Sequence, residues 1–256
     1  MDQQNREEAV RAHWEDPATV SLADQNLRAL EVAAIKAFIP PGRPLLDVGC
    51  GDGCNTVEFA AIAGETLGVD YSKEMIARAD RRLPGCQLAG LAFRRLELDE
   101  LAGLAGGYQT VVTQRCLINL TEFAAQAAAI RAIAGLLAPG GSFLMLECVE
   151  QGRQNLNDLR AKAGLGPIAM PWHNAFFDEK ALEDCLAGLF NIRAVVDFSL
   201  YYLITRVMNP MTGLAFDDPW SKRLDDTARR LQDIFGLERL QGIGPQRLYV
   251  LDKPGA

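Results

Sequence analysis

Short apolar runs alternate along the chain with segments in which apolar residues recur every three or four positions. The runs predict β-strands near residues 44–48, 65–70, 91–97, 108–113, 141–147, 190–198 and 246–252. Helices are predicted in the segments 54–63, 72–83, 121–138 and 178–190. Ser72, Thr121 and Asp178 open the last three, and each could cap its helix. The alternation is typical of an α/β sheet built from parallel crossovers.

Three segments do not follow this alternation. Residues 1–38, 150–177 and 203–240 are long, polar-rich and partly helical. Long excursions from a compact sheet are usually lids or substrate-binding elements, so we expect these three to cover a site.

Composition and charge limit the classes of partner that the chain is expected to bind. The chain has 256 residues, of which 49% are hydrophobic, which is enough to bury the core of one large domain. Its net charge is -7 and it has no Lys/Arg block, so we expect a small-molecule partner, no nucleic acid and no anionic membrane surface. Six cysteines without a CxxC pair suit a reducing cytoplasm. The polar start "MDQQNREEAVRAHWED" predicts neither a secretion signal nor a membrane span, and therefore a cytoplasmic location.

The stretch "LLDVGCGDGCNTVEF" carries the strongest motif. Asp47 closes the first predicted strand, Gly49, Gly51 and Gly53 follow at every second position, and a helix begins at once. Such glycines let backbone N–H groups and a helix N-terminus approach a ligand. A dinucleotide fingerprint would need its third glycine at Cys54, and a P-loop would need a lysine, so neither phosphate motif matches.

The spacing D-x-G-x-G-x-G resembles motif I of the class I S-adenosylmethionine-dependent methyltransferases. "LGVDYSKEMIARA" resembles their second strand, whose acidic residue for the ribose hydroxyls would be Asp70. "FRRLELDEL" resembles the segment in which an acidic residue faces the adenine amine, and Glu97 replaces the more usual aspartate. "LLAPGGSFLMLE" resembles the helix, turn and fifth strand, so the resemblance covers roughly residues 43–148.

This resemblance implies one Rossmann-like three-layer domain over residues 1–256, with a seven-stranded, mostly parallel sheet whose last strand is antiparallel. Residues 1–38 would form a helical cap, 43–148 the cofactor-binding core, and 150–177 and 203–240 the lids. The implied cofactor is S-adenosylmethionine, whose sulfonium and ammonium charges suit an acidic, glycine-lined crevice. Asp47 would lie near the methionyl end, although Asp47 could instead only cap its loop and Asp70 only cap the helix "SKEMIARA". The residues expected to bind the cofactor are Asp47, Gly49, Gly51, Gly53, Asp70, Tyr71, Glu97, Leu98 and Gln114.

The segment after the fourth predicted strand, "TVVTQRCLINLTE", bears on the acceptor. Amino-group methyltransferases acting on nucleobases or glutamine carry Asn/Asp-Pro-Pro-Tyr/Phe there, and catechol-type enzymes carry a metal-binding aspartate. This chain has Gln114, Arg115 and Cys116 instead, so both subclasses lose support and no metal is expected. Cys116 has no second catalytic cysteine in an obvious place and is interpreted as a packing residue.

The chain has two histidines, His13 and His173. His173 lies in the irregular segment "AMPWHNAFFDE", over the substrate side in this fold, and is the expected general base; a structural role is the alternative. His13 and Trp14 are expected in an N-terminal helix that closes over the cofactor.

Polar residues of the second and third excursions complete the predicted site. Amides and a guanidinium close together are typical of a site that binds hydroxyls or anions, although a solvated helix face is the alternative. With "RCLINL" and "SLYYLITRV", they resemble a subgroup of bacterial class I methyltransferases, some encoded among polysaccharide-building enzymes. The residues expected to bind the acceptor are Arg115, Asn155, Asn157, Arg160, Trp172, Asn174, Tyr201, Tyr202 and Arg206.

The function predicted from these features is O-methylation of a small hydroxylated or anionic acceptor, such as a sugar or sugar-phosphate. N-methylation of a small amine is the enzymatic alternative. A regulatory protein that binds the cofactor without turnover is the alternative from another class.

Overall fold

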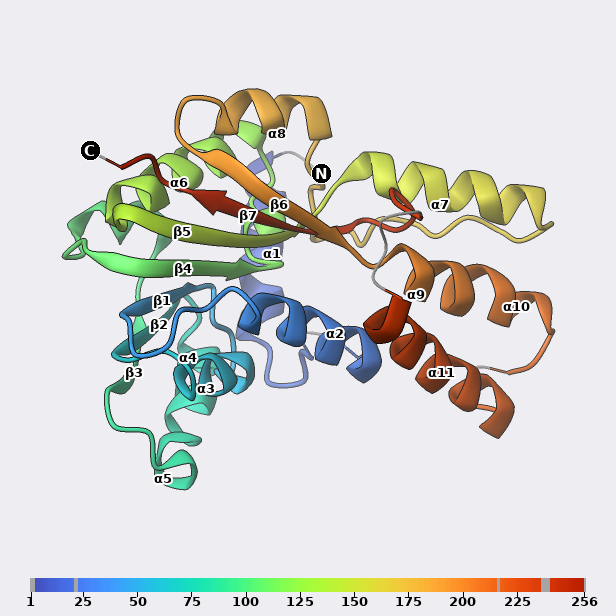
Figure 1. The fold of residues 1–256 in the computed structure, drawn as a ribbon, viewed down its shortest axis with the longest axis horizontal. Helices are drawn as coiled ribbons and strands as arrows, with labels where there is room; N and C mark the ends of the chain where they lie inside the picture. Colours follow the sequence, from blue (N-terminus) through green and yellow to red (C-terminus); the bar gives the residue numbers. More distant parts are fainter. Residues whose placement is uncertain (1–2, 21–22, 216, 236–239, 256) are drawn as a thin grey trace.

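A computed structural model describes residues 3–20, 23–215, 217–235 and 240–255. A seven-stranded sheet forms its centre, in the order β3-β2-β1-β4-β5-β7-β6 (Figure 1). The strands are β1 (Leu45–Val48), β2 (Thr66–Asp70), β3 (Leu91–Arg95), β4 (Tyr108–Gln114), β5 (Leu137–Cys148), β6 (Asn191–Asp197) and β7 (Gln246–Asp252). β7 runs antiparallel to both of its neighbours, whereas β1 to β5 pair in parallel. The predicted fold class is therefore confirmed.

The helical elements come from all parts of the chain. They are α1 (Gln3–Glu15), α2 (Gln25–Lys36), α3 (Cys54–Ala60), α4 (Lys73–Asp80), α5 (Leu83–Cys86), η1 (Leu98–Gly103), η2 (Leu117–Asn119), α6 (Phe123–Leu136), α7 (Glu150–Lys162), α8 (Glu179–Leu186), α9 (Ser199–Leu203), the π-helical η3 (Ile204–Met208), α10 (Asn209–Met211) and α11 (Pro219–Phe235).

Two apolar layers sandwich the sheet. On one face Val48, Val111 and Phe143 pack with apolar residues of α6 and α8. On the other face Leu45 and Val112 pack with residues of α2, α7, α9 and α11. Residues 141–148 of β5 are all buried, as expected for a central strand covered on both faces.

Local sequence signals explain most helix starts. Ser72 and Asp178 cap α4 and α8 by accepting hydrogen bonds from the backbone N–H groups of Met75 and Ala181, as predicted. The prediction for Thr121 was wrong: α6 starts two residues later, without a side-chain cap. Thr121 instead donates a hydrogen bond to Glu7 of α1 (3.2 Å), so its hydroxyl serves a tertiary contact.

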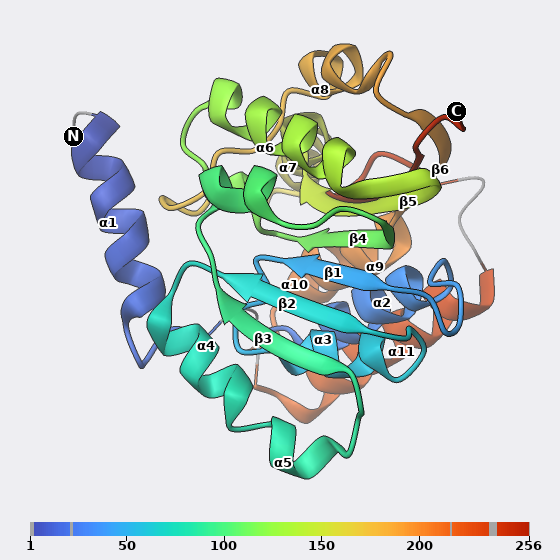
Figure 2. The same cartoon turned by 90° about the vertical axis from the view of Figure 1, so that its left-hand side faces the viewer.

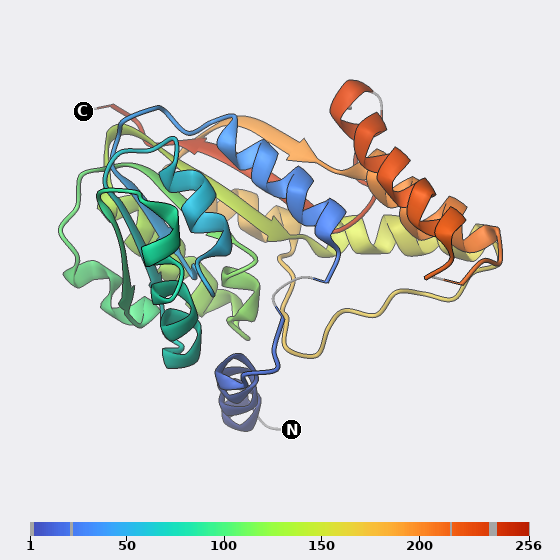
Figure 3. The same cartoon turned by 90° about the horizontal axis from the view of Figure 1, so that it is seen from below.

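The three excursions become helices outside the sheet. Figure 1 shows α7, α10 and α11 extending beyond the ends of β5 and β7. Figures 2 and 3 show α1 standing apart from the sheet, beside α4. Residues 1–2 and 21–22 of the first excursion and 216 and 236–239 of the third lie outside the described residues.

Candidate active site

The loop after β1 bends through three left-handed glycines. Gly49, Gly51 and Gly53 have φ values of 72°, 54° and 72°. A Cβ on Gly49 would overlap the Cys116 sulfur, so only glycine fits there. Gly49 and Gly51 line a cavity of about 1010 Å³.

Gly53 has a different role from the one predicted. It is the N-cap of α3, and a Cβ there would come within 2.6 Å of Phe93 and 2.9 Å of Ala79. It does not line the cavity, and its lack of a side chain instead allows α3, α4 and β3 to approach one another.

Asp70, at the carboxyl end of β2, is held against this loop. Its Oδ2 accepts a hydrogen bond from the Gly51 N–H (3.0 Å) and its Oδ1 accepts one from the Ser72 N–H (2.9 Å). Burial raises the pKa of Asp70, while these two hydrogen bonds favour its ionised form. The carboxylate therefore faces the cavity in a fixed orientation.

The large cavity lies at the carboxyl ends of β1, β2 and β4. The residues expected from the sequence to bind the cofactor that line it are Gly49, Gly51, Asp70, Tyr71, Glu97, Leu98 and Gln114. Asp47 instead lines a smaller cavity of about 210 Å³, which shares Gly49, Gly51, Gln114 and Arg115 with the large one. The two spaces are therefore adjoining parts of one crevice, at the place where open α/β sheets bind ligands.

Asp47 is almost completely inside the protein, with 3% exposure. Its carboxylate accepts a hydrogen bond from the Thr56 hydroxyl (2.6 Å), and burial raises its pKa to about 7. A buried carboxylate with one hydrogen-bond donor has spare acceptor capacity that a cationic ligand group could use.

Glu97 joins the crevice to α1. The strand predicted to reach residue 97 ends at Arg95, and Glu97 becomes the N-cap of η1. Its two carboxylate oxygens accept hydrogen bonds from the Arg11 guanidinium at 2.6 and 3.0 Å. The residue that the resemblance assigned to adenine is therefore also the docking point of the N-terminal helix.

Further polar contacts hold α1 over the cavity. Trp14 donates to the side chain of Asn119 (3.3 Å), and Arg6 donates to the backbone oxygen of Asn174 (2.8 Å). Glu15 accepts hydrogen bonds from the first residues of α4. Val10 is the one buried apolar side chain among the described residues of α1, so the helix is held mainly by polar groups.

A buried glutamate that was not predicted from the sequence supports the cavity wall formed by Gln114 and Arg115. Glu31 of α2 is 0% exposed, accepts a hydrogen bond from Gln114 (2.7 Å) and forms an ion pair with Arg115 (3.5 Å). Leu27, Glu31 and Ile35 occupy one face of α2 at four-residue spacing. A carboxylate on an apolar stripe was the signal that could have identified it.

The residues predicted to bind the acceptor divide into two groups. Arg115, Asn174, Tyr202 and Arg206 line the large cavity. Arg115 has φ 54°, unusual for a residue with a side chain, and lies just after β4. Arg206 belongs to the π-helical η3, a type of element frequent at functional sites, and pairs with Asp24.

The other five do not line this cavity. Asn155 donates to Gly242, Asn157 exchanges hydrogen bonds with the backbone of Ile168, and Arg160 donates to Gly166. These backbone contacts hold the loops on either side of α7. Tyr201 is buried and donates to Asp24, and Trp172 is 52% exposed.

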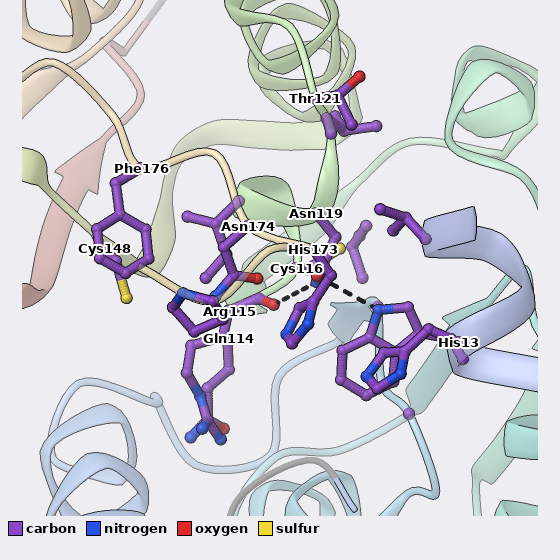
Figure 4. Close-up of a pocket in the computed structure, with 18 of the residues that line it drawn as sticks. His13, Gln114, Arg115, Cys116, Asn119, Thr121, Cys148, His173, Asn174 and Phe176 are labelled. Carbon is purple, nitrogen blue, oxygen red and sulfur yellow. Dashed lines mark hydrogen bonds between the residues drawn. The ribbon is translucent and has the colours of Figure 1, made fainter. Parts of the chain in front are cut away.

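His173 lines the cavity next to His13, as Figure 4 shows. The two rings are stacked, with centroids 4.6 Å apart and an interplanar angle of 20°. Burial lowers the pKa of His173, and the neighbouring His13 lowers it further. A neutral imidazole is therefore favoured at neutral pH.

Cys116 is a packing residue, as expected. Its sulfur lies against Gly49, and burial raises the pKa of its thiol, which opposes the thiolate needed for nucleophilic attack.

In the part of the chain that the structure describes, there is no group of three or more His, Cys, Asp or Glu residues that could hold a metal ion. None of the described helices is both long and apolar enough to span a bilayer.

Comparisons with known proteins agree with this geometry. Residues 45–141 match the family described as a methyltransferase domain. The ubiquinone biosynthesis O-methyltransferase of Methylococcus capsulatus is 33% identical over 132 residues, which cover 50% of this chain and 54% of that protein. The chain thus matches only about half the length of its curated relatives.

Two solved structures share the fold across nearly the whole chain. The cyclopropane synthase MmaA2 from Mycobacterium tuberculosis has a TM-score of 0.62 at 15% identity, covering 96% of this chain and 98% of that one. The magnesium protoporphyrin IX methyltransferase ChlM from Synechocystis, with bound S-adenosylmethionine, has a TM-score of 0.58 at 15% identity, covering 98% and 97%. Sheet order, glycine loop and matched domain define a Rossmann-like methyltransferase fold. Residues 45–141 therefore match a methyltransferase domain, and they lie within a sheet of the Rossmann-like fold.

Proposed function

We propose that the protein transfers the methyl group of S-adenosylmethionine to a hydroxyl oxygen of a small acceptor. The observation that carries this proposal is one continuous cavity of about 1010 Å³ that contacts both the Gly49–Gly51 loop with Asp70 and, elsewhere on its wall, His173. This space is large enough for a nucleoside cofactor and an acceptor together.

The crevice fits the cofactor. Asp70 is held by two backbone N–H groups in an orientation that suits a pair of ribose hydroxyls. Tyr71 and Leu98 supply apolar surface beside it for a base, and Asp47 faces the adjoining space where a cationic tail would lie. When bound, the cofactor supplies a methyl group activated by a positively charged sulfur.

The cavity wall supports an acceptor with an apolar body. The polar residues first expected to bind sugar hydroxyls, Asn155, Asn157 and Arg160, are used in backbone contacts outside the cavity. Apolar side chains occupy much of the wall, among them Leu27, Leu101, Ile118, Leu156, Ile168 and Phe176. A sugar needs several hydrogen bonds to replace those it makes with water, whereas a hydroxylated aromatic or aliphatic compound needs few. The curated relatives named for ubiquinone biosynthesis support an oxygen acceptor.

His173 is the proposed general base. As the new carbon–oxygen bond forms and the carbon–sulfur bond breaks, the electron pair of the latter stays on sulfur and the acceptor hydroxyl must lose its proton. The neutral imidazole of His173 accepts that proton and later releases it to water. Arg115, held by Glu31, and Asn174 are polar groups of the same cavity that could orient the acceptor oxygen.

The test is methyl transfer from isotopically labelled S-adenosylmethionine to a panel of phenols, aliphatic alcohols, sugars, sugar-phosphates and amines, followed by mass spectrometry of the products. We expect an O-methyl product from an apolar hydroxylated compound. If amines are the only acceptors that become labelled, the reaction is N-methylation and this proposal is wrong. Cofactor binding without transfer to any acceptor would favour the regulatory binding protein.

The role of the base is tested on the acceptor so found. His173→Ala should lower kcat by about 10²–10⁴-fold and leave cofactor affinity nearly unchanged. The matched control is Met170→Ala, which alters an exposed residue of the same segment that does not line the cavity. If His173→Ala keeps more than about a tenth of the parental kcat, positioning alone carries the reaction.

A further inference from the structure

The stacked histidines come from two segments that are far apart in the sequence. His13 lies near the end of α1, and His173 lies in the irregular segment between α7 and α8. Both rings line the large cavity, so the contact joins the N-terminal helix to the wall that carries the proposed base (Figure 4).

Two tryptophans enclose the pair. Trp14 meets His173 edge-on with ring centroids 5.8 Å apart, and Trp172 meets both histidines edge-on at 5.5 and 5.6 Å. Each of the two chain segments therefore contributes one histidine and one tryptophan. The four rings form a cluster that exists only while α1 is docked.

The imidazole of His173 is oriented by ring packing and not by a hydrogen bond to its Nδ1. A histidine base is usually oriented by a hydrogen bond from its Nδ1, which sets its tautomer. Here Nδ1 of His173 is buried and has no hydrogen-bond partner among the described residues. Ring packing, chiefly the parallel contact with His13, is the remaining restraint on the imidazole plane.

We propose that His13 is a positioning residue for His173, holding the imidazole by stacking so that the acid–base site is complete only when α1 is docked over the cavity. The inference rests on the proposed role of His173 as the base. It assigns to the N-terminal helix a part in the chemistry in addition to covering the cofactor.

The charged groups on the elements around the pair are engaged with other partners, and His13 is the neighbour that lowers the pKa of His173. On α1, Arg6 is engaged with backbone oxygens of Trp172 and Asn174, Glu7 with Thr121, Arg11 with Glu97, and Glu15 with the start of α4. At the end of β4, Arg115 is paired with Glu31. Asn119 below the cluster is neutral and accepts from Trp14. Protonation of both rings would bring two positive charges together and should favour release of α1.

The experiment uses the fact that the chain has two histidines. Proton–carbon correlation spectra of the whole protein, labelled at histidine, should show one ring signal for each, and their chemical shifts can be followed against pH without any acceptor. His13→Phe keeps an aromatic ring but removes the charge, whereas His13→Ala removes both. Glu8→Gln, at an exposed position of α1, is the matched control.

In His13→Phe, the midpoint of the His173 titration should rise, and kcat should change less than in His13→Ala. In His13→Ala, the His173 signal should broaden or split as the ring loses its restraint, and kcat should fall about tenfold or more, with KM for S-adenosylmethionine changing less. An unaltered His173 titration and an unaltered kcat in both variants would overturn the inference.

The two readouts separate this inference from the proposed function. If the protein transfers methyl groups but the two histidines titrate independently, His13 does not position His173. The proposed methyltransferase function then still stands. If the titrations are coupled but the protein methylates no acceptor, the contact between the rings is real. The reaction that this contact was inferred to serve is then absent, and the inference is wrong.

Discussion

At the scale of single residues, two aspartates of the crevice make different contacts. Asp70 accepts two backbone hydrogen bonds and thereby ties the glycine loop to the end of β2. Asp47 accepts one hydrogen bond, from Thr56, and keeps further acceptor capacity toward the smaller cavity. Burial raises the pKa of both carboxyl groups, so both store an electrostatic cost that a cationic or hydroxylated ligand can relieve.

Gly51→Val should abolish cofactor binding. Gly51 has φ 54°, which a β-branched residue rarely adopts, and its N–H is bonded to Asp70. Asp70→Asn should weaken binding by about 1.5–3 kcal/mol. Titration calorimetry with S-adenosylhomocysteine measures the affinity of both variants. Gly188→Ala, at a left-handed position with open space around it, controls for backbone strain alone. Parental affinity in both site variants would mean that the loop does not bind the cofactor.

Asp47→Asn should change how stability depends on pH. The pKa of Asp47 rises from 3.8 to about 7 on folding, so between these values the folded state binds more protons than the unfolded state. Stability therefore falls as pH rises through this window, and the loss is complete above about pH 7. We expect the asparagine variant to gain about 1–3 kcal/mol relative to the parent at pH 8, and little at pH 4. Urea unfolding at both values measures this, and an equal difference at the two would contradict it.

At the scale of elements, a buried glutamate at the end of β5 organises the segment after β4. Glu147 is 0% exposed and accepts hydrogen bonds from the N–H groups of Cys116, Leu117 and Ile118 at 3.0–3.3 Å. Burial raises its pKa to about 7 despite these donors. The N-terminus of η2 is thereby held next to the glycine loop, and Cys116 is held against Gly49.

Glu147→Gln should destabilise the protein by about 2–4 kcal/mol, because the amide NH₂ would replace an acceptor that faces buried N–H donors. Chemical denaturation measures the loss. Glu150→Gln is the control, since Glu150 pairs with Arg153 near the surface and should cost less than about 1 kcal/mol. Similar losses in the two variants would mean that the hydrogen bonds of Glu147 contribute little.

The docking of α1 depends on polar contacts, and Glu15 makes three of them. It accepts hydrogen bonds from the Ser72 hydroxyl and from the N–H groups of Lys73 and Glu74, at 3.1–3.2 Å. Glu15→Ala should therefore leave the core intact and speed the dissociation of S-adenosylhomocysteine about tenfold, which stopped-flow fluorescence can measure. Glu8→Gln should not alter this rate. An unchanged rate in Glu15→Ala would mean that α1 does not limit cofactor release.

At the scale of the whole molecule, helices from three distant parts of the chain surround the carboxyl ends of the parallel strands. α1 and the segment between α7 and α8 meet over the cavity, and η3 closes its far side with Arg206. The sheet forms the base, and α7 and η3 pack on it through apolar side chains, whereas α1 is held mainly by polar and ring contacts. Cofactor exchange and acceptor selection are therefore expected to depend on the covering segments rather than on the sheet.

Turnover should not require a divalent metal ion. The carboxylates at the end of β5 and the start of α7 are both engaged, Glu147 with three backbone N–H groups and Glu150 with Arg153. Methyl transfer should continue at the same rate in EDTA. An enzyme that stops in EDTA and recovers with Mg²⁺ would require a different mechanism of proton removal.

Local patterns in the sequence determined the sheet and the glycine loop. The seven strands were predicted because each is a short apolar run bounded by turn residues, and the caps at Ser72 and Asp178 depend on hydrogen bonds within a few residues. The conformation of the glycine loop was predictable for the same reason, since Gly49, Gly51 and Asp70 are arranged by backbone geometry at strand ends.

Only the tertiary structure decided which polar side chains face the cavity. Asn155, Asn157 and Arg160 fitted a binding pattern, but the loops packed against α7 take their hydrogen bonds. Glu31 was not among the residues predicted for the site, and the packing of α2 places it beside Gln114 and Arg115. The stacking of His13 on His173 joins segments that no local pattern relates. Side-chain partners of this kind are set by the packing of distant elements, and that packing depends on the whole chain.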